Sequence, residues 1–196
     1  METDAANGLD EERAALFALL GRLLSEPPDA ALLARLRGLG GDGTRLGGAL
    51  ADLAAAAAAA DPAALEREHF NLFIGVGRGE LMPYGSWYLT GFLHDRPLAE
   101  LRGALRRLGV ERAPGVPEPE DHIAFLCETF AGLIEGRFGG GGRDAATEFF
   151  ALHLRPWAAR FFGDLEKAAA ARFYRAVGAL GRVAVEIEGA AADLPS

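Results

Sequence analysis

The sequence predicts an all-α fold, and three observations support this prediction. Half of the 196 residues are hydrophobic, and much of that fraction is alanine, which favours helices, whereas Val, Ile and Thr are scarce. Apolar residues recur at helical spacing over most of the chain. Side chains typical of helix ends stand beside those segments. The length favours one domain, so we expect a single helical bundle of about eight to ten helices over residues 1–196.

The first half of the chain divides into four predicted helices. Asp10 resembles an N-cap before a leucine-rich segment that ends at Pro27-Pro28. A short helix follows over residues 32–39, and the next runs from about Thr44 to Ala60 through an alanine tract. Asp61-Pro62 has the pattern of an N-cap followed by proline at the first helical position. The helix that follows should carry Leu65, His69, Leu72 and Phe73 on one side.

The second half predicts further helices with a flexible break. Pro97 begins a helix that Gly109 ends, and another helix starts after His122. Residues 139–142 are all glycine, which indicates a loop tip between two amphipathic segments. An aromatic segment follows, and the final helix begins near Phe173 and passes Ile187.

Helical spacing does not explain the segment from Ile74 to Phe92. Gly75, Gly77 and Gly79 suggest a phosphate-binding loop, but the Gly-Lys-Ser/Thr ending and a preceding strand are missing, so a turn is the better interpretation. Rings follow at Tyr84, Trp87, Tyr88 and Phe92. Each could belong to the core, but interleaved Pro, Gly and Ser disfavour a regular core helix, and Tyr and Trp suit a partly wet groove.

The run Glu118-Pro119-Glu120-Asp121-His122 has the composition of a helix start. Proline at the first position and carboxylates in the first turn are both typical there. We therefore expect Asp121 to cap this helix. Nothing in a helix start requires His122, so we expect its side chain to face a binding partner.

The same residues argue against an enzyme or a metal site. The four histidines are isolated from one another, and Cys127 is the only cysteine. Ser86, Asp121 and His122 have the residue types of a hydrolase triad, but Ser86 lacks the Gly-x-Ser-x-Gly context. We expect no catalytic residue, no metal ligand and no cofactor.

The net charge and the hydropathy of the chain argue against two kinds of partner, nucleic acids and membranes. The net charge of -8 argues against nucleic-acid binding. The N-terminus is acidic where a secretory signal would be basic, and no apolar run approaches the roughly 20 residues that span a bilayer. We therefore expect a cytoplasmic protein without stable membrane insertion.

Three ordered segments resemble the TorD/DmsD/NarJ family of maturation chaperones. They are Leu72-Phe73 preceded by Glu68, then residues 83–88 (Pro-Tyr-Gly-Ser-Trp-Tyr), then residues 118–122 (Glu-Pro-Glu-Asp-His). Each motif alone is weak, but the ordered set is specific. Residues 153–157 and Phe173-Tyr174 are also similar to that family, so the resemblance covers nearly the whole chain from about Leu16.

The resemblance implies a TorD-like, cofactor-free helical chaperone for a molybdenum- or tungsten-containing oxidoreductase subunit. Family members bind their client's N-terminal segment, often a twin-arginine signal peptide, and hold it until the cofactor is inserted. The residues expected to contact the client are Leu72, Phe73, Pro83, Tyr84, Ser86, Trp87, Tyr88, Glu118, Pro119, Asp121 and His122.

Two other functions stay open. One is an assembly factor that binds a folded apoenzyme surface without reading a signal peptide. A more distant one is a small hydrolase or a nucleotide-dependent enzyme. The client's identity and the choice between monomer and homodimer are also open.

Overall fold

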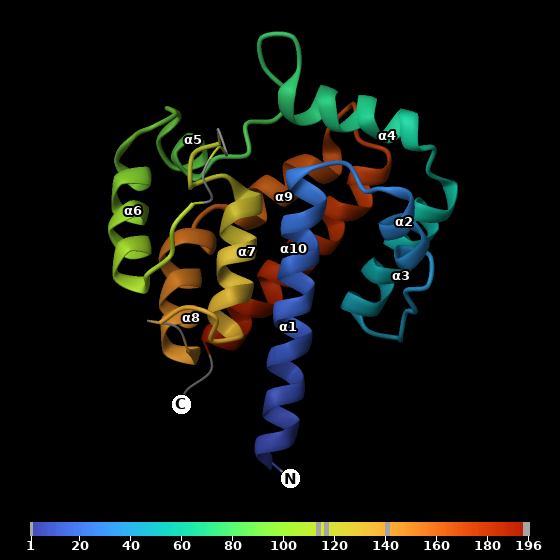
Figure 1. Ribbon diagram of the computed structural model, residues 1–196. Coiled ribbons are helices and arrows are strands. Elements are labelled where there is room, and N and C mark those ends of the chain that lie inside the picture. The colour runs from blue at the N-terminus through green and yellow to red at the C-terminus, as the bar shows by residue number, and fades with distance from the viewer. Residues whose placement is uncertain (1, 113–114, 116–117, 140–141, 194–196) are drawn as a thin grey trace. The chain divides into compact units, whose positions relative to one another are not determined.

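The computed structural model describes residues 2–112, 115, 118–139 and 142–193 (Figure 1). These residues form ten α-helices and two π-helical turns, and they contain an isolated β-bridge but no β-strand. The predicted all-α fold is therefore confirmed. Within the described residues no single helix is long and apolar enough to cross a membrane. The pair Arg45–Ala59 and Pro62–Ile74 reaches that length only across a bend of 117°.

The chain divides into two compact units, and neither is a continuous segment. Unit 1 comprises Met1–Ser25 and Tyr84–Trp157, and unit 2 comprises Glu26–Pro83 and Ala158–Ser196. Unit 1 contains α1 (Glu2–Ser25), α5 (Gly85–Thr90), α6 (Arg96–Leu108), α7 (Ile123–Ile134), α8 (Arg143–Phe149) and the π-helical turn η2 (Phe150–Leu154). Unit 2 contains α2 (Ala30–Leu36), α3 (Arg45–Ala59), α4 (Pro62–His69), the π-helical turn η1 (Phe70–Ile74), α9 (Ala158–Lys167) and α10 (Phe173–Ala192).

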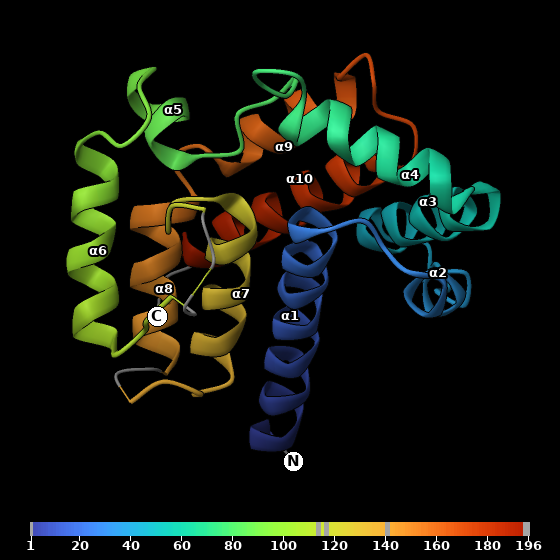
Figure 2. The same cartoon turned by 45° about the horizontal axis from the view of Figure 1, so that its top comes forward.

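The core of unit 1 forms where α1 lies alongside α7 (Figure 2). The ring of Phe17 meets that of Phe130 edge-on at 4.7 Å, and Phe130 in turn lies 5.5 Å from Phe150. Gly21 allows the close approach, because a Cβ there would lie 2.7 Å from Cγ of Glu128. The absence of a side chain at this position therefore sets how closely the two helices pack.

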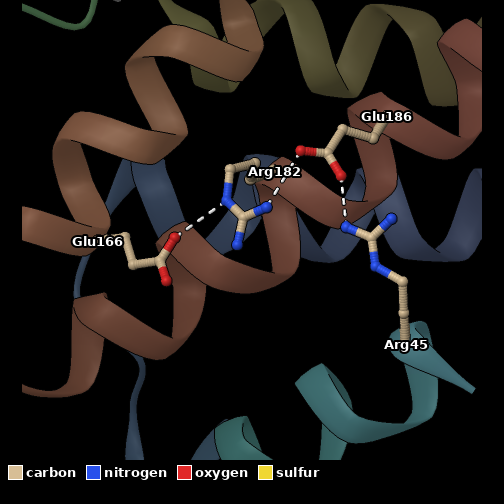
Figure 3. Close-up of polar contacts among 4 residues, drawn as sticks. All are labelled: Arg45, Glu166, Arg182 and Glu186. Carbon is tan, nitrogen blue, oxygen red and sulfur yellow. Dashed lines mark hydrogen bonds and ion pairs between the residues drawn. The ribbon is translucent and has the colours of Figure 1, made fainter.

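In unit 2 the buried helix α10 packs against α9 and α3. A Cβ at Gly181 would lie 2.2 Å from the ring of Phe162, so glycine lets α9 cross α10 closely. Two arginines and two glutamates tie the same three helices together at the surface (Figure 3). Glu186 accepts from Arg45 at 2.5 Å and from Arg182 at 3.0 Å, and Arg182 also donates to Glu166 at 3.0 Å.

Most helix-end signals in the sequence are confirmed. Thr44 and Asp61 cap α3 and α4 through their side chains, and Gly109 ends α6 in the left-handed conformation. The predicted cap at Asp10 is wrong, because α1 begins at Glu2. Asp10 instead lies inside α1, where it pairs with Arg13 at 2.5 Å and with Arg143 at 2.7 Å.

The glycine-rich segment after η1 forms a turn, as predicted. Gly75 has a φ of 62°, and a Cβ there would lie 1.9 Å from the carbonyl oxygen of Arg78. The chain then returns along η1, and the N–H of Leu81 donates to the carbonyl of Leu72 at 2.9 Å. Only glycine can occupy such a position without displacing the backbone.

Candidate functional site

Two of the three sequence motifs meet inside unit 1. Tyr84 and His122 pair through an isolated antiparallel bridge, and the N–H of Gly85 donates to the carbonyl of Asp121 at 2.9 Å. The hydroxyl of Tyr84 donates to the carboxylate of Glu118. Residues separated by more than thirty positions in the sequence thus form one cluster, which we call the motif cluster (residues 84–88 and 118–122).

Asp121 holds the start of α5 in place. This residue is 3% exposed, and its Oδ2 accepts from the N–H of Ser86 at 2.8 Å. We expected this carboxylate to cap the helix that follows it in sequence. It instead satisfies a backbone donor at the N-terminus of α5, a role that local sequence cannot indicate because the two residues lie 35 positions apart.

His122, not Asp121, caps α7. Its Nδ1 accepts from the N–H of Ala124 at 3.2 Å. The ring also packs against that of Tyr84 at 5.3 Å. The expectation that a helix start gives no reason for a histidine is therefore wrong. The ring is half-buried and retains some exposed surface.

The Tyr84 hydroxyl is a stable hydrogen-bond donor. Burial raises the pKa of this phenol far above its ordinary value, and the hydrogen bond to Glu118 and the negative charges of Glu118 and Asp121 raise it further. The phenol therefore stays protonated throughout the physiological range. Such a group can bind and orient a partner but is a poor acid.

The aromatic segment forms a short helix, which the sequence did not indicate. Trp87 is half-buried, whereas Tyr88 is 8% exposed and packs on Trp157 with 5.4 Å between ring centroids. Ser86 is completely buried, and among the described residues its hydroxyl has no partner. Trp87 and Tyr84 thus offer more surface to a partner than Tyr88 and Ser86 do.

A pocket of about 260 Å³ adjoins the motif cluster in unit 1. Its apolar lining comes from Leu89, Pro97, Leu101, Leu126, Leu152 and Trp157. Leu89 and Leu152 are 43% and 55% exposed, so apolar surface continues out of the pocket. Asp121, Glu100 and Arg96 also line it, and Arg96 pairs with Glu100 at 3.3 Å.

More apolar surface follows α5 in the sequence. Phe92 is 70% exposed and Leu93 is 38% exposed, and both lie between Gly91, which ends α5 with a φ of 81°, and the start of α6. Sequence reasoning singled out Phe92 but missed Leu89, Leu93 and Leu152. Two apolar residues in a loop between helices are the signal that could have revealed Leu93.

Of the remaining predicted residues, some belong to unit 1 and others to unit 2. Glu118 is exposed and Pro119 half-buried in unit 1. Leu72, Phe73 and Pro83 belong to unit 2, so the motif cluster does not include them. Leu72 is completely buried, and the half-buried ring of Phe73 packs on Tyr174 at 5.4 Å.

The glutamate that precedes Leu72-Phe73 has a structural role. The buried carboxylate of Glu68 accepts from the N–H groups of Arg172, Phe173 and Tyr174 at 2.7, 3.2 and 2.8 Å. It thereby satisfies the donors at the start of α10. This contact spans more than one hundred positions, which explains why the sequence alone gave Glu68 no role.

The chain is similar to known proteins in sequence. It is 34% identical over 116 residues to the Tat proofreading chaperone DmsD of Salmonella paratyphi A, covering 58% of this chain and 54% of that protein. It is 30% identical over 105 residues to the chaperone protein TorD of Vibrio cholerae serotype O1, covering 50% and 48%. The chain thus spans about half the length of these curated relatives.

The fold is also similar to that of a solved structure. A redox enzyme maturation protein from Archaeoglobus fulgidus aligns with a TM-score of 0.56 and 20% identity, covering 89% of this chain and 93% of that one. At this identity the likeness concerns the fold alone. The nitrate reductase delta subunit family matches residues 41–163, which is more than half of the sequence. The resemblance seen in the three motifs is therefore confirmed, and the chain belongs to the nitrate reductase delta subunit family.

Proposed function

We propose that this protein is a maturation chaperone that binds the N-terminal segment of a redox enzyme subunit. It acts by binding and not by catalysis, and it holds the segment until the enzyme's cofactor has been inserted. The names of its relatives support this proposal, since DmsD is a Tat proofreading chaperone and TorD a chaperone protein. The client in this proposal is a molybdenum or tungsten oxidoreductase, as the motif resemblance implies.

The observation that carries the proposal is the pocket in unit 1 with its exposed apolar rim. An export signal has a basic part followed by an apolar stretch. Leu89 and Leu152 line the pocket and are 43% and 55% exposed, so they offer apolar surface to a partner. Glu100 and Asp121 also line the pocket, where Glu100 pairs with Arg96 and the buried Asp121 accepts from the N–H of Ser86. The apolar rim would bind the apolar stretch, and the carboxylate of Glu100 would pair with the basic part in place of Arg96.

The free energies of apolar contacts and of ion pairs indicate different roles for the two kinds of contact. Burying apolar surface contributes about 25 cal/mol per Å², whereas an exposed ion pair contributes only about 0.2–1 kcal/mol. Apolar contacts would therefore supply most of the affinity, and the carboxylates would favour segments that carry arginine. Ordering a flexible peptide costs about 2–5 kcal/mol. The net affinity is then moderate, which lets a holding chaperone release its client.

The same proposal covers the other predicted residues of unit 1. Tyr84, Trp87, Glu118 and His122 would contact the peptide from the motif cluster, with Ser86, Tyr88, Pro119 and Asp121 supporting them. A chaperone that holds a segment before export acts in the cytoplasm.

Calorimetric titration with synthetic peptides tests this function. The probe carries two consecutive arginines followed by an apolar stretch. One matched peptide has glutamines in place of the arginines, and another has serines in place of the apolar residues. We expect the serine peptide to lose most of the affinity and the glutamine peptide to lose less. If the protein binds none of these peptides but binds the folded apoenzyme, it is an assembly factor that does not read the segment.

A further inference from the structure

A second pocket, in unit 2, has a different chemical character. It has a volume of about 510 Å³ and lies among the end of α3, α4 and the start of α10. This volume is in the range of ligand pockets, about 300–1,000 Å³. Its apolar floor consists of Ala56, Ala59, Ala60, Ala64, Leu65 and Phe173. Three arginines also line it, namely Arg67 from α4, Arg172 just before α10, and Arg175 in its first turn.

The arginines have no carboxylate partner among the described residues. Arg175 donates to the carbonyl of Ala171 at 3.3 Å, and none of the three forms an ion pair in the part of the chain that the structure describes. Two acids line the pocket, but both cap helices. Asp61 accepts from the N–H of Ala64 at 2.8 Å, and Glu68 accepts from the start of α10. An acidic protein therefore presents a basic pocket here.

We propose that this pocket binds an acidic segment of a partner polypeptide, in which carboxylates alternate with small apolar side chains. The carboxylates would pair with Arg67, Arg172 and Arg175. The apolar side chains would cover the alanine floor. This surface has the opposite charge preference from the pocket in unit 1, so the inference stands independently of the proposed function.

The backbone N–H groups at the N-terminus of α10 already have a hydrogen-bond acceptor. This argues for a peptide as the ligand of the pocket and against a phosphate group. Phosphates bind helix N-termini through free backbone N–H groups. Here the N–H groups of Arg172, Phe173 and Tyr174 already donate to the carboxylate of Glu68, at 2.7, 3.2 and 2.8 Å. A phosphate would find those donors satisfied and a negative charge beside them. It would depend on the arginine side chains alone.

The arginines alone cannot hold a small anion tightly. All three are exposed, and an exposed ion pair raises affinity by about fivefold at most, so three pairs give about one hundredfold. Additional affinity has to come from burying the apolar floor. A small inorganic anion has no apolar part that could cover alanines. A polypeptide segment supplies both kinds of contact at once.

Titration of the intact chain with a synthetic peptide of alternating Glu and Ala or Leu tests the proposal. The Arg172→Gln/Arg175→Gln variant should bind this peptide about two- to thirtyfold more weakly than the unmodified chain. Arg106→Gln provides the matched control, since Arg106 is an exposed arginine on α6 in unit 1. It should leave the affinity unchanged. Circular dichroism melting checks that both variants fold.

Three results would overturn the inference. The acidic peptide fails to bind, a peptide with Gln in place of Glu binds equally well, or the double variant keeps full affinity. Displacement of the peptide by equimolar inorganic phosphate would show a simple anion site and also contradict it. The arginine-bearing peptide used for unit 1 should bind the double variant normally. Failure of one proposal can therefore be distinguished from failure of the other.

Discussion

At the scale of single residues, some aromatic side chains in and around the motif cluster can contact a partner, whereas others stabilise the fold. Trp87 is half-buried on α5, whereas Trp157 is 2% exposed and packs beneath Tyr88. The two tryptophans therefore allow a direct comparison of an aromatic ring that can meet a partner with one that stabilises the fold.

Trp87→Ala should weaken peptide binding by about 2 kcal/mol or more if this ring is a hot spot of the interface. Its stability loss should be smaller than that of Trp157→Ala, for which a buried aromatic predicts about 3–5 kcal/mol. Calorimetric titration and denaturant unfolding of both variants give the two quantities. If Trp87→Ala unfolds the protein but binds normally per folded molecule, the ring belongs to the core.

His122 should affect stability, because it caps α7 through Nδ1. His122→Ala should therefore lower the free energy of unfolding by about 0.5–2 kcal/mol, and His122→Asn should restore most of it, since Asn is a strong N-cap. Thermal melting measures the stability change. Peptide titration of the Asn variant then isolates binding, and a weaker affinity at unchanged stability is the result expected of a ring that faces the client. Equal stability of the Ala and wild-type proteins would contradict the capping role.

At the scale of helices, residues near a helix end predicted where the helix begins or stops, but the sequence did not predict which distant segments contact one another. Caps at Thr44, Asp61 and Gly109 follow from side-chain and glycine chemistry within a few residues. The short helix α5 escaped sequence analysis because its N-terminus depends on Asp121, 35 positions away. The contact of Glu68 with α10 is longer still. Hydrophobic spacing says nothing about such partners, which tertiary packing chooses.

The ion pairs that join α3, α9 and α10 predict that the stability of the fold depends on pH. The hydrogen bond from Arg45 is the main reason why the pKa of Glu186 lies below its ordinary value of 4.5, with Arg182 adding to the effect. A lowered pKa in the folded state stabilises the protein above the unfolded value, and this contribution is lost as the pH falls through the folded value. The pairs are exposed, so each is worth only about 0.2–1 kcal/mol.

Glu186→Gln should therefore lower the melting temperature slightly at neutral pH. The difference from the unmodified protein should shrink as the pH falls below the ordinary glutamate value of 4.5. Added salt should shrink it as well. Scanning calorimetry over pH checks this, and a difference that grows on acidification would contradict the assigned pairing.

At the scale of the whole molecule, the course of the chain bears on domain number. The backbone passes between the units three times, at Ser25, Pro83 and Trp157, and neither unit is one continuous segment. Sequence length predicted one domain over residues 1–196, and this remains our proposal. We expect one cooperative unfolding transition, with the calorimetric enthalpy equal to the van't Hoff enthalpy. Two separate transitions would show two domains.

We propose that the apolar rim of the unit 1 pocket binds the client's N-terminal segment. Leu89→Ser/Leu152→Ser removes the apolar surface of that rim, since the two residues are 43% and 55% exposed. Covering the exposed part of two leucines is worth about 1.5–3 kcal/mol, which corresponds to at least about a tenfold change in affinity. Ile187→Ser, at an exposed apolar position on α10, is the matched control.

The decisive measurement is the dissociation constant of the arginine-bearing apolar peptide for these two variants and the unmodified chain, determined in one buffer by calorimetric titration. We expect the double variant to bind at least about tenfold more weakly, while the Ile187 variant binds normally and all three proteins melt at similar temperatures. Unchanged affinity in the folded double variant would contradict it.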